Sequence, residues 1–392
     1  MLDFNKTIYE LTEDQPNLLD FFIANGLSQL ENKLIVKSLG RKMTLNDALS
    51  KQNIDAEGFA EKLSQYLAQT QCGPDASLNQ GEMSRGDIDI KGVLPCPIHL
   101  PLRDAILNET QRIEDESGIK ISYDLRTANL GVSWITDEPD IILSAGFEMF
   151  FSKKMKVEYL QTGIYSGGDY PVDKTLIQHG AELKDPNGYY HIVGIVPAIF
   201  IVNKDRLEGR QMPRSWADLL NEQYADSVAI PKGDLDLYNA ILLTIKAHHG
   251  VNGLLALGRS MAADLHPSQM TRSKTSTPLP LVNVAPYFFS QMVTEPNLEI
   301  VWPEDGAIVS PIFMLAKMNK PYVKDVADAI CSTKIADIFN VGGKFPATAP
   351  GTQNFLKADQ RLMFAGWDYL NSHDIEAELA QAEELFHQTS VV

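Results

Sequence analysis

The sequence has few of the residues that build disulfide frameworks, zinc clusters or membrane spans. Its three cysteines, Cys72, Cys96 and Cys331, are odd in number and widely spaced, whereas disulfide scaffolds and zinc sites need paired or closely spaced cysteines. No stretch approaches the ~20 apolar residues that cross a bilayer. We therefore expect no disulfide framework, no zinc cluster and no membrane insertion.

Basic residues are also scarce. Lys and Arg number 34 against 51 Asp and Glu, which gives a formal net charge of −17. Nucleic-acid binding needs clustered cations that neutralise phosphates, so we expect no nucleic-acid partner. The start, MLDFNKTIYELTEDQPNLLDFF, lacks the basic segment and the uninterrupted apolar run of a secretory signal. As given, the chain is expected in the cytoplasm, or in the periplasm or outside the cell if an export signal is missing from it.

The motifs of common enzyme classes are missing as well. The sequence contains no Walker phosphate loop, no G-x-S-x-G elbow and no H-E-x-x-H zinc motif. A pair of carboxylates in two distinct environments cannot be identified either. An enzyme is therefore not the default interpretation. The cofactor stays unknown, since the sequence is compatible with none and with a metal ion bound as the ligand.

Residues 1–70 are predicted to form a small helical domain. Thr44 opens the pattern T-L-N-D-A-L, a capping-box-like helix start in which Asp47 replaces the usual Glu. A hydrophobic first helix, the Gly26-Leu27 turn and this "TLxxA" helix resemble the domain of unknown function 1858. The resemblance implies a docking or regulatory module, and a purely structural appendage is an equal alternative. Residues 71–89 are polar, Gly-rich and without periodicity, which predicts a linker.

From residue 90 onward, strand and helix patterns alternate. IKGVLP, GIKISYDL and DIILSAG are predicted strands with helical patterns between them, which favours a parallel sheet whose cleft lies at the carboxyl ends of the strands. Two long apolar segments, YYHIVGIVPAIFIVNKDRL and LEIVWPEDGAIVSPIFMLAK, are predicted to cross between lobes. We therefore expect an α/β fold with lobe 1 at residues 90–198 and 304–392 and lobe 2 at residues 199–303.

The segment PAIFIVNKDRL…MPRSWADLLNEQYADSVAIP resembles the type 2 periplasmic-binding-protein superfamily, and in particular the ferric-iron branch of ABC-transporter solute-binding proteins. Trp216, Asp218 and Leu219 match the "P-x-SW-x-DLL" helix start of that branch. The segments WPEDGAIVSP and GGKFPATAPG resemble its returning hinge and a late loop of its first lobe. The resemblance implies a two-lobed Venus-flytrap fold with two hinge crossings. Ferric binders of this branch typically present adjacent tyrosines from the second lobe, whereas the tyrosine pair here, Tyr189–Tyr190, precedes the first crossing and the second lobe offers Tyr287.

Candidate ligand-binding residues in lobe 1 follow two predicted strands. Cys96 and His99 come after the first strand, and three readings stay open for Cys96: ligation of a soft metal, a nucleophile, or an inert buried thiol. Ser144, Gly146 and Phe147 end the third strand at the predicted start of a helix, where backbone N–H groups favour anions.

Lobe 2 offers further candidates near the starts of helices and the ends of strands. Asp236 is a helix cap or a ligand group, and Tyr238 and Asn239 lie on the same helix start. Tyr287 is expected to provide an aromatic wall, and Asp305 lies at the returning hinge. A metal ion would use Cys96, His99 and His266, and without a metal His266 is a solvated loop histidine. The complete set of candidate site residues in both lobes is Cys96, His99, Ser144, Gly146, Phe147, Asp236, Tyr238, Asn239, His266, Tyr287 and Asp305.

The leading hypothesis is a binding protein that grips a small anion, a polar organic solute or a metal between two lobes. Its expected partners are that ligand and an ABC permease or another protein that docks on the N-terminal domain. One alternative is a cytoplasmic ligand sensor or adaptor. The other is a thiaminase-like transferase, which the flytrap fold resembles, with Cys96 as nucleophile and Asp236 or Asp305 as base.

Overall fold

The computed structural model describes two compact units, Met1–Ala76 and Ser77–Val392. The described residues are 86–95, 98–127, 138–147, 149–273 and 278–390 together with Leu78 and Asn79; in the first unit they are residues 6–14 and 40–52 and the single positions Phe4, Leu18, Phe22, Leu27, Leu30, Ile54 and Phe59.

The first unit has a hydrophobic core of its own. Helix α1 (Ile8–Asp14) and helix α4 (Leu45–Lys51) contribute to it, and Phe22 and Phe59 pack against each other inside it. The predicted capping box is confirmed: Thr44 Oγ1 accepts the N–H of Asp47 at 3.1 Å, and the Asp47 carboxylate accepts the N–H of Thr44 at 3.2 Å. Residues 60–70 of the predicted helical domain lie outside the described residues.

The second unit is built on one sheet in the order β1-β3-β2-β4-β10-β5-β8-β6-β7, with β11 on β10 and β9 on β5. The strands are β1 (Leu78–Asn79), β2 (Ile88–Leu94), β3 (Ile121–Thr127), β4 (Ile141–Ala145), β5 (His191–Asn203), β6 (Val228–Ala229), β7 (Met261–Ala263), β8 (Val282–Pro286), β9 (Leu298–Val301), β10 (Ala307–Ala316) and β11 (Leu362–Met363).

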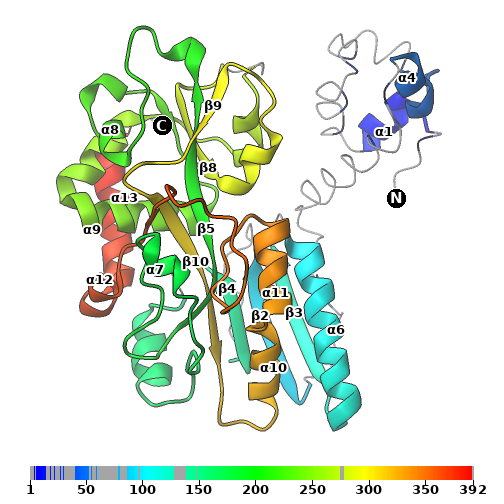
Figure 1. Ribbon diagram of the computed structural model, residues 1–392, viewed down its shortest axis with the longest axis vertical. Helices are drawn as coiled ribbons and strands as arrows, with labels where there is room; N and C mark the ends of the chain where they lie inside the picture. The colour runs from blue at the N-terminus through cyan, green and yellow to red at the C-terminus, as the bar shows by residue number, and fades with distance from the viewer. Residues whose placement is uncertain are drawn as a thin grey trace. The chain divides into compact units, whose positions relative to one another are not determined.

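Helices cover both faces of this sheet (Figure 1). One group, at the right in the figure, contains α6 (His99–Ser117), α10 (Val323–Ile330) and α11 (Thr333–Asp337). On the other side α9 (Leu235–Ser260) packs against α13 (Ile375–Thr389) and β10. Shorter helices are α7 (Thr175–Gln178), α8 (Trp216–Leu219) and α12 (Trp367–Ser372). Two separate hydrophobic cores result, with alternating β4 residues Ile142 and Leu143 in different ones.

Strand β5 runs through both parts of the sheet, whereas β10 pairs with β4, with β11 and with the first part of β5. The first part of β5 pairs with β10 from Ile308↔Ala198 to Met314↔His191, and its second part pairs with β8 and β9. β5 is the first of the two segments that the sequence predicts to cross between lobes, and β9 followed by β10 forms the second. Lobe 1 therefore contains the parallel strands β2, β3 and β4, and lobe 2 contains the parallel strands β6, β7 and β8. Within the predicted linker, Leu78 and Asn79 form β1 on the edge of lobe 1.

The segment after β4 differs from the sequence prediction of a helix. It begins as turns, with one helical hydrogen bond from Phe151 N–H to Phe147 O at 3.0 Å, and continues as a π-helical segment at Met155–Leu160. Phe147, Phe150 and Phe151 all contact Phe313 of β10. Because all three rings bury against one residue, the local backbone follows aromatic packing rather than a regular amphipathic helix.

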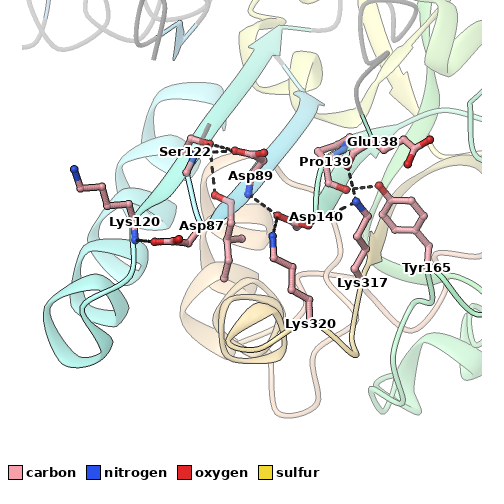
Figure 2. A network of polar contacts seen from close by, with 12 residues as sticks. Asp87, Asp89, Lys120, Ser122, Glu138, Pro139, Asp140, Tyr165, Lys317 and Lys320 are labelled. Atoms are coloured by element: carbon pink, nitrogen blue, oxygen red, sulfur yellow. Dashed lines mark hydrogen bonds and ion pairs between the residues drawn. The ribbon is translucent and has the colours of Figure 1, made fainter. Parts of the chain in front are cut away.

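A buried polar network fixes the amino ends of β2 and β4 (Figure 2). The Asp140 carboxylate accepts the Asp89 N–H at 3.0 Å and the Lys320 ammonium at 2.6 Å, and Lys317 lies 3.6 Å away. Ser122 donates its hydroxyl to Asp89. Because Lys317 and Lys320 follow β10, the network joins the starts of three strands to the end of a fourth.

Candidate functional site

The parallel strands of both lobes direct most of the predicted candidates to strand carboxyl ends. Cys96 follows β2, Gly146 follows β4, and Asp236 follows β6. His266 follows β7 and Tyr287 follows β8. In open α/β sheets, ligands bind beyond the carboxyl ends of the strands. The candidate site is therefore the region where these ends of the two lobes face each other.

The turn after β4 brings lobe 1 to the centre of this region. Ser144 is fully buried and donates its hydroxyl to Ala145 O at 3.1 Å. Gly146 has a φ of +89° and donates its N–H to Pro311 O of β10 at 3.2 Å. Phe147 is buried against Phe313. The backbone of Gly146, rather than the side chains beside it, is therefore the group of this turn that meets the facing lobe.

Helix α9 starts directly against that turn. A Cβ atom placed on Gly146 would lie 2.3 Å from Asp236 Oδ1, so the two backbones and this carboxylate pack without spare room. Ser310 of β10 donates its hydroxyl to Asp236 O at 3.1 Å. The sequence predictions for Gly146 and Asp236 thus converge at one place, where lobe 1, β10 and lobe 2 meet. Ser310 belongs to the same place and was missed, because it looks like an ordinary residue in an apolar strand.

The first turn of α9 is acidic. Asp234 caps the helix by accepting the Leu237 N–H at 3.4 Å, and Asp236 follows two residues later. Burial raises the pKa of the Asp234 carboxyl to about 6, against the opposing effect of that hydrogen bond. The helix dipole favours negative charge here, and the protein's own carboxylates already supply it. A bare anion at this helix start would be repelled by them.

Tyr238 and Asn239 are separated by the geometry of α9. Tyr238 is 2% exposed, and its ring packs edge-on against Phe386 of α13 at 5.7 Å. Its buried hydroxyl has no hydrogen-bond partner within the described part of the chain, and burial raises its pKa. Tyr238 therefore lies in the interface of α9 with α13, whereas Asn239 keeps partial exposure.

Tyr287 joins an aromatic group contributed by both lobes. Its ring stacks on Phe355 at 5.2 Å with an interplanar angle of 19°, and meets Trp302 edge-on at 5.2 Å. Lys344 Nζ lies 5.8 Å from the centre of the Phe355 ring. All three rings are partly exposed. The sequence did not identify Phe355, because it lies in a loop without periodicity. The nearby segment GGKFPATAPG was the one signal that pointed to this part of the chain.

His266 and Asp305 have structural partners. His266 caps the short helix η7 (Pro267–Thr271), and its Nδ1 lies 2.8 Å from Ser268 Oγ, while desolvation lowers the pKa of the imidazole. Asp305 accepts the N–H groups of Trp216 and Ala217 at 3.0 and 3.1 Å, which caps α8. Both side chains therefore stabilise helix starts in lobe 2.

The first candidate loop stays a prediction. Cys96 and Pro97 lie outside the described residues, and His99 begins α6 with its side chain also outside them. Among the residues that the structure describes, no three His, Cys, Asp or Glu side chains form a group that could hold a metal ion. The grouping of Cys96, His99 and His266 as metal ligands therefore stays a prediction.

One described helix passes a membrane-span test by length and composition alone. The stretch Asp236–Ser260 of α9 has a mean hydropathy of 1.2, and half of it is buried inside the protein. The backbone leaves helical geometry at Gly250, with φ 66° and ψ −165°. Because core helices pass the same test, and α9 packs on α13 and β10, this is weak evidence for a span.

Comparisons with known proteins match both units. Residues 136–373 match the family model "Bacterial extracellular solute-binding protein", and residues 2–59 match the "Domain of unknown function (DUF1858)". No curated protein matches the chain.

Solved structures match the two-lobed unit. A Trichodesmium protein, "(IdiA) (FutA) in complex with iron and citrate ligands", is 12% identical with a TM-score of 0.55 over 77% of this chain and 98% of that one. Apo FutA2 from Synechocystis PCC6803 is 14% identical with a TM-score of 0.54 over 77% and 98%. The apo ferric ion-binding protein A of Pasteurella haemolytica is 14% identical with a TM-score of 0.53 over 76% and 97%. At these identities the likeness shows the fold, which is the predicted type 2 periplasmic-binding-protein fold.

Proposed function

The chain belongs to the family of bacterial extracellular solute-binding proteins, and from this premise we propose that it grips one small polar solute between its lobes and presents the closed form to an ABC-transporter permease. The observation that carries the proposal is the meeting of Gly146, Ser310 and Asp236 beside β5, the strand that runs through both lobes. Groups from both lobes at one place allow a ligand to stabilise the closed form over the open one.

The chemistry of the described groups restricts the solute. Asp234 and Asp236 make the start of α9 negative, and Tyr287, Phe355 and Trp302 offer aromatic faces. Carboxylates and aromatic rings together favour positive charge or hydrogen-bond donors. We therefore propose a polar organic solute with amine or hydroxyl donors, or a metal complex that presents such groups, in preference to a bare anion. Ferric citrate, whose carboxylates make it an anion, is tested beside these solutes because iron and citrate are bound in the similar Trichodesmium structure.

Calorimetry and thermal shift on the full chain test this proposal. The panel contains ferric citrate, free citrate, small amines, amino acids and polyols. We expect one class to bind and to raise the unfolding temperature, and we expect Asp236→Asn and Tyr287→Ala each to weaken that ligand at least tenfold.

Asp305→Asn is the matched control. It also removes one carboxylate charge, but at a group that caps α8. It should lower stability and leave ligand affinity within about twofold, because cap loss acts on the helix alone. A panel without any binder would refute the proposal, as would equal affinity losses for Asp305→Asn and Asp236→Asn.

A second function, a ligand sensor or adaptor, is favoured by the separate domain that precedes the lobes. Residues 2–59 match their own family model and have their own core. We propose that this domain docks a protein partner. Cell fractionation and affinity capture, done with the full chain and with residues 77–392, distinguish the transport function from the sensor function. An exported chain that captures permease favours transport, and a cytoplasmic chain that loses its partner with residues 1–76 favours the sensor.

A further inference from the structure

His191 lies at the amino end of β5, far along the strand from the candidate cleft. It is 5% exposed, and its ring nitrogens form no hydrogen bond with any residue of the described ranges. The ring centre of Tyr170 lies 5.1 Å from that of His191, and the Tyr170 hydroxyl donates a hydrogen bond to Asp328. Because its nitrogens form no such bond, they are available to a ligand in the cavities that His191 lines.

Cavities lie on two sides of this imidazole. The larger, of about 320 Å³, is polar and open and is lined by Tyr170, Lys184, Asp185 and His191. The smaller, of about 10 Å³, is lined by His191, Cys331, Ser332 and Thr348 among others. A space of this size holds about one water or one ion. His191 therefore lies between a large cavity and one with room for about a single water or ion.

One sulfur atom, of Cys331, lines the small cavity, and a second, of Met314, lies next to it. Met314 of β10 is the direct cross-strand partner of His191, so their side chains project from the same face of the sheet. Cys331, at the end of α10, places its Sγ 3.8 Å from Met314 Sδ. The nearby oxygens are already engaged, because Thr348 donates to Ile192 O and Ser332 accepts the Ile335 N–H to cap α11. What remains for a ligand is an imidazole nitrogen, a thiol and a thioether.

We propose that His191, Met314 and Cys331 form a binding site for a soft monovalent metal ion, Cu⁺ or its analogue Ag⁺. Thiolate and thioether ligands select such ions, and imidazole suits them as well. Burial keeps the Cys331 thiol protonated in the free protein by raising its pKa. Binding forms the S–metal bond, breaks the S–H bond and releases one proton to solvent, with no change of oxidation state.

The site is independent of the proposed solute function. His191 and Met314 pair with each other opposite Leu143, the middle residue of β4, whereas the cleft candidates follow Ala145 at the end of that strand. It also uses none of the residues proposed for the solute. Failure of one proposal therefore leaves the other untouched.

Silver titration tests the proposal directly. The full chain is prepared with Cys72→Ser and Cys96→Ser, so that Cys331 is the single thiol, and Ag⁺ as nitrate is added in chloride-free buffer. Native mass spectrometry counts bound ions, and competition with a soft-metal chelator gives the affinity. We expect one Ag⁺ per chain.

Met314→Leu is the decisive variant, since it conserves volume and leaves Cys331 in place. We expect it, and His191→Gln, each to weaken Ag⁺ at least tenfold. Met270→Leu, at another fully buried methionine, is the matched control and should leave the affinity unchanged. If Met314→Leu and His191→Gln bind Ag⁺ as tightly as the parent, the thiol acts alone and the three-ligand site is wrong. Absence of any bound Ag⁺ in the parent overturns it equally.

Discussion

At the scale of single residues, Gly146 occupies a position where a side chain would disturb the structure twice. Its φ of +89° is unfavourable for L-residues, and an added Cβ would meet Asp236 Oδ1 at 2.3 Å. The strained backbone alone costs about 1–2 kcal/mol, and the contact between lobes adds to it.

We therefore expect Gly146→Ala to lower the free energy of unfolding by about 2 kcal/mol or more, as measured by urea denaturation. Gly163→Ala is the matched control, because Gly163 has φ +72° and nothing within 4 Å of the added atom. Adding Asp236→Ala to Gly146→Ala should recover the part of the loss that exceeds the control. Equal losses for the two glycine variants would mean that the carboxylate does not press on Gly146.

His191 makes stability depend on pH. Burial lowers the pKa of its imidazole to about 4, and the charge of Lys184 acts in the same direction, whereas an unfolded histidine has a pKa of about 6.5. The unfolded state therefore binds a proton first, so the neutral ring stabilises the fold fully above pH ~6.5 and loses this effect as the pH falls toward 4.

The expected loss from His191 between pH 7.5 and 5 is about 2 kcal/mol. The buried His249 has its pKa lowered as well, so the test is the difference between parent and His191→Gln in urea denaturation at both pH values. The variant should lose about 2 kcal/mol less than the parent over this interval. Parallel pH profiles would exclude His191 as the source.

At the scale of elements, the amino ends of β2 and β4 depend on one carboxylate. Asp140 is 2% exposed and pairs with Lys320, whose side chain is 39% exposed, and with the buried N–H of Asp89. Removing one partner of a buried charged network is far more costly than removing an exposed pair.

Asp140→Ala should therefore destabilise the protein by about 3 kcal/mol, and Lys320→Met by about 1 kcal/mol. Lys324→Met is the control, because the pair with Asp328 is exposed on α10, and its loss should stay below about 0.5 kcal/mol. Chemical denaturation of the three variants gives the comparison. Similar losses of unfolding free energy for Asp140→Ala and Lys324→Met would show that the buried network does not hold the strand ends together.

Element identity could largely be predicted from the sequence, and side-chain use could not. The long apolar runs identify β5 and β10, because a strand that is buried on both faces has apolar residues at successive positions. Thr44 and Ser215 identify helix starts, because their side chains cap the helices that follow them. Asp305, by contrast, reads like a hinge ligand, yet its carboxylate binds the backbone of α8, a segment almost ninety positions away along the chain. Contacts between distant segments leave no local pattern.

The candidate site shows the same division. Gly146 and Asp236 were both predicted to face the cleft, each from the strand it follows, because strand ends meet at one edge of a sheet. Their mutual contact depends on the angle between the lobes, and Phe355 and Ser310 depend on loop and strand packing, so neither follows from spacing. The soft donors His191, Met314 and Cys331 are likewise neighbours only through the β5–β10 register.

At the scale of the whole molecule, the start of the two-lobed unit is the sharpest remaining question. The sequence predicts a linker up to residue 89, whereas the compact unit begins at Ser77. Leu78 and Asn79 extend the sheet beside β3, and Asp89 joins the network through its N–H and its bond with Ser122.

Two truncations decide where the unit begins. Residues 77–392 retain both cores, β1 and the Asp89 contacts, so this chain should unfold cooperatively and bind the solute as tightly as the full protein. Residues 90–392 lose the start of β2, one edge strand and a buried carboxylate at once, and should be less stable by about 3 kcal/mol or more. Urea denaturation of both chains, with calorimetry on the folded ones, measures this. Equal stability would place the true boundary near residue 90 and make the segment before it a linker after all, because β1 and Asp89 would then contribute nothing that the rest of the sheet cannot replace.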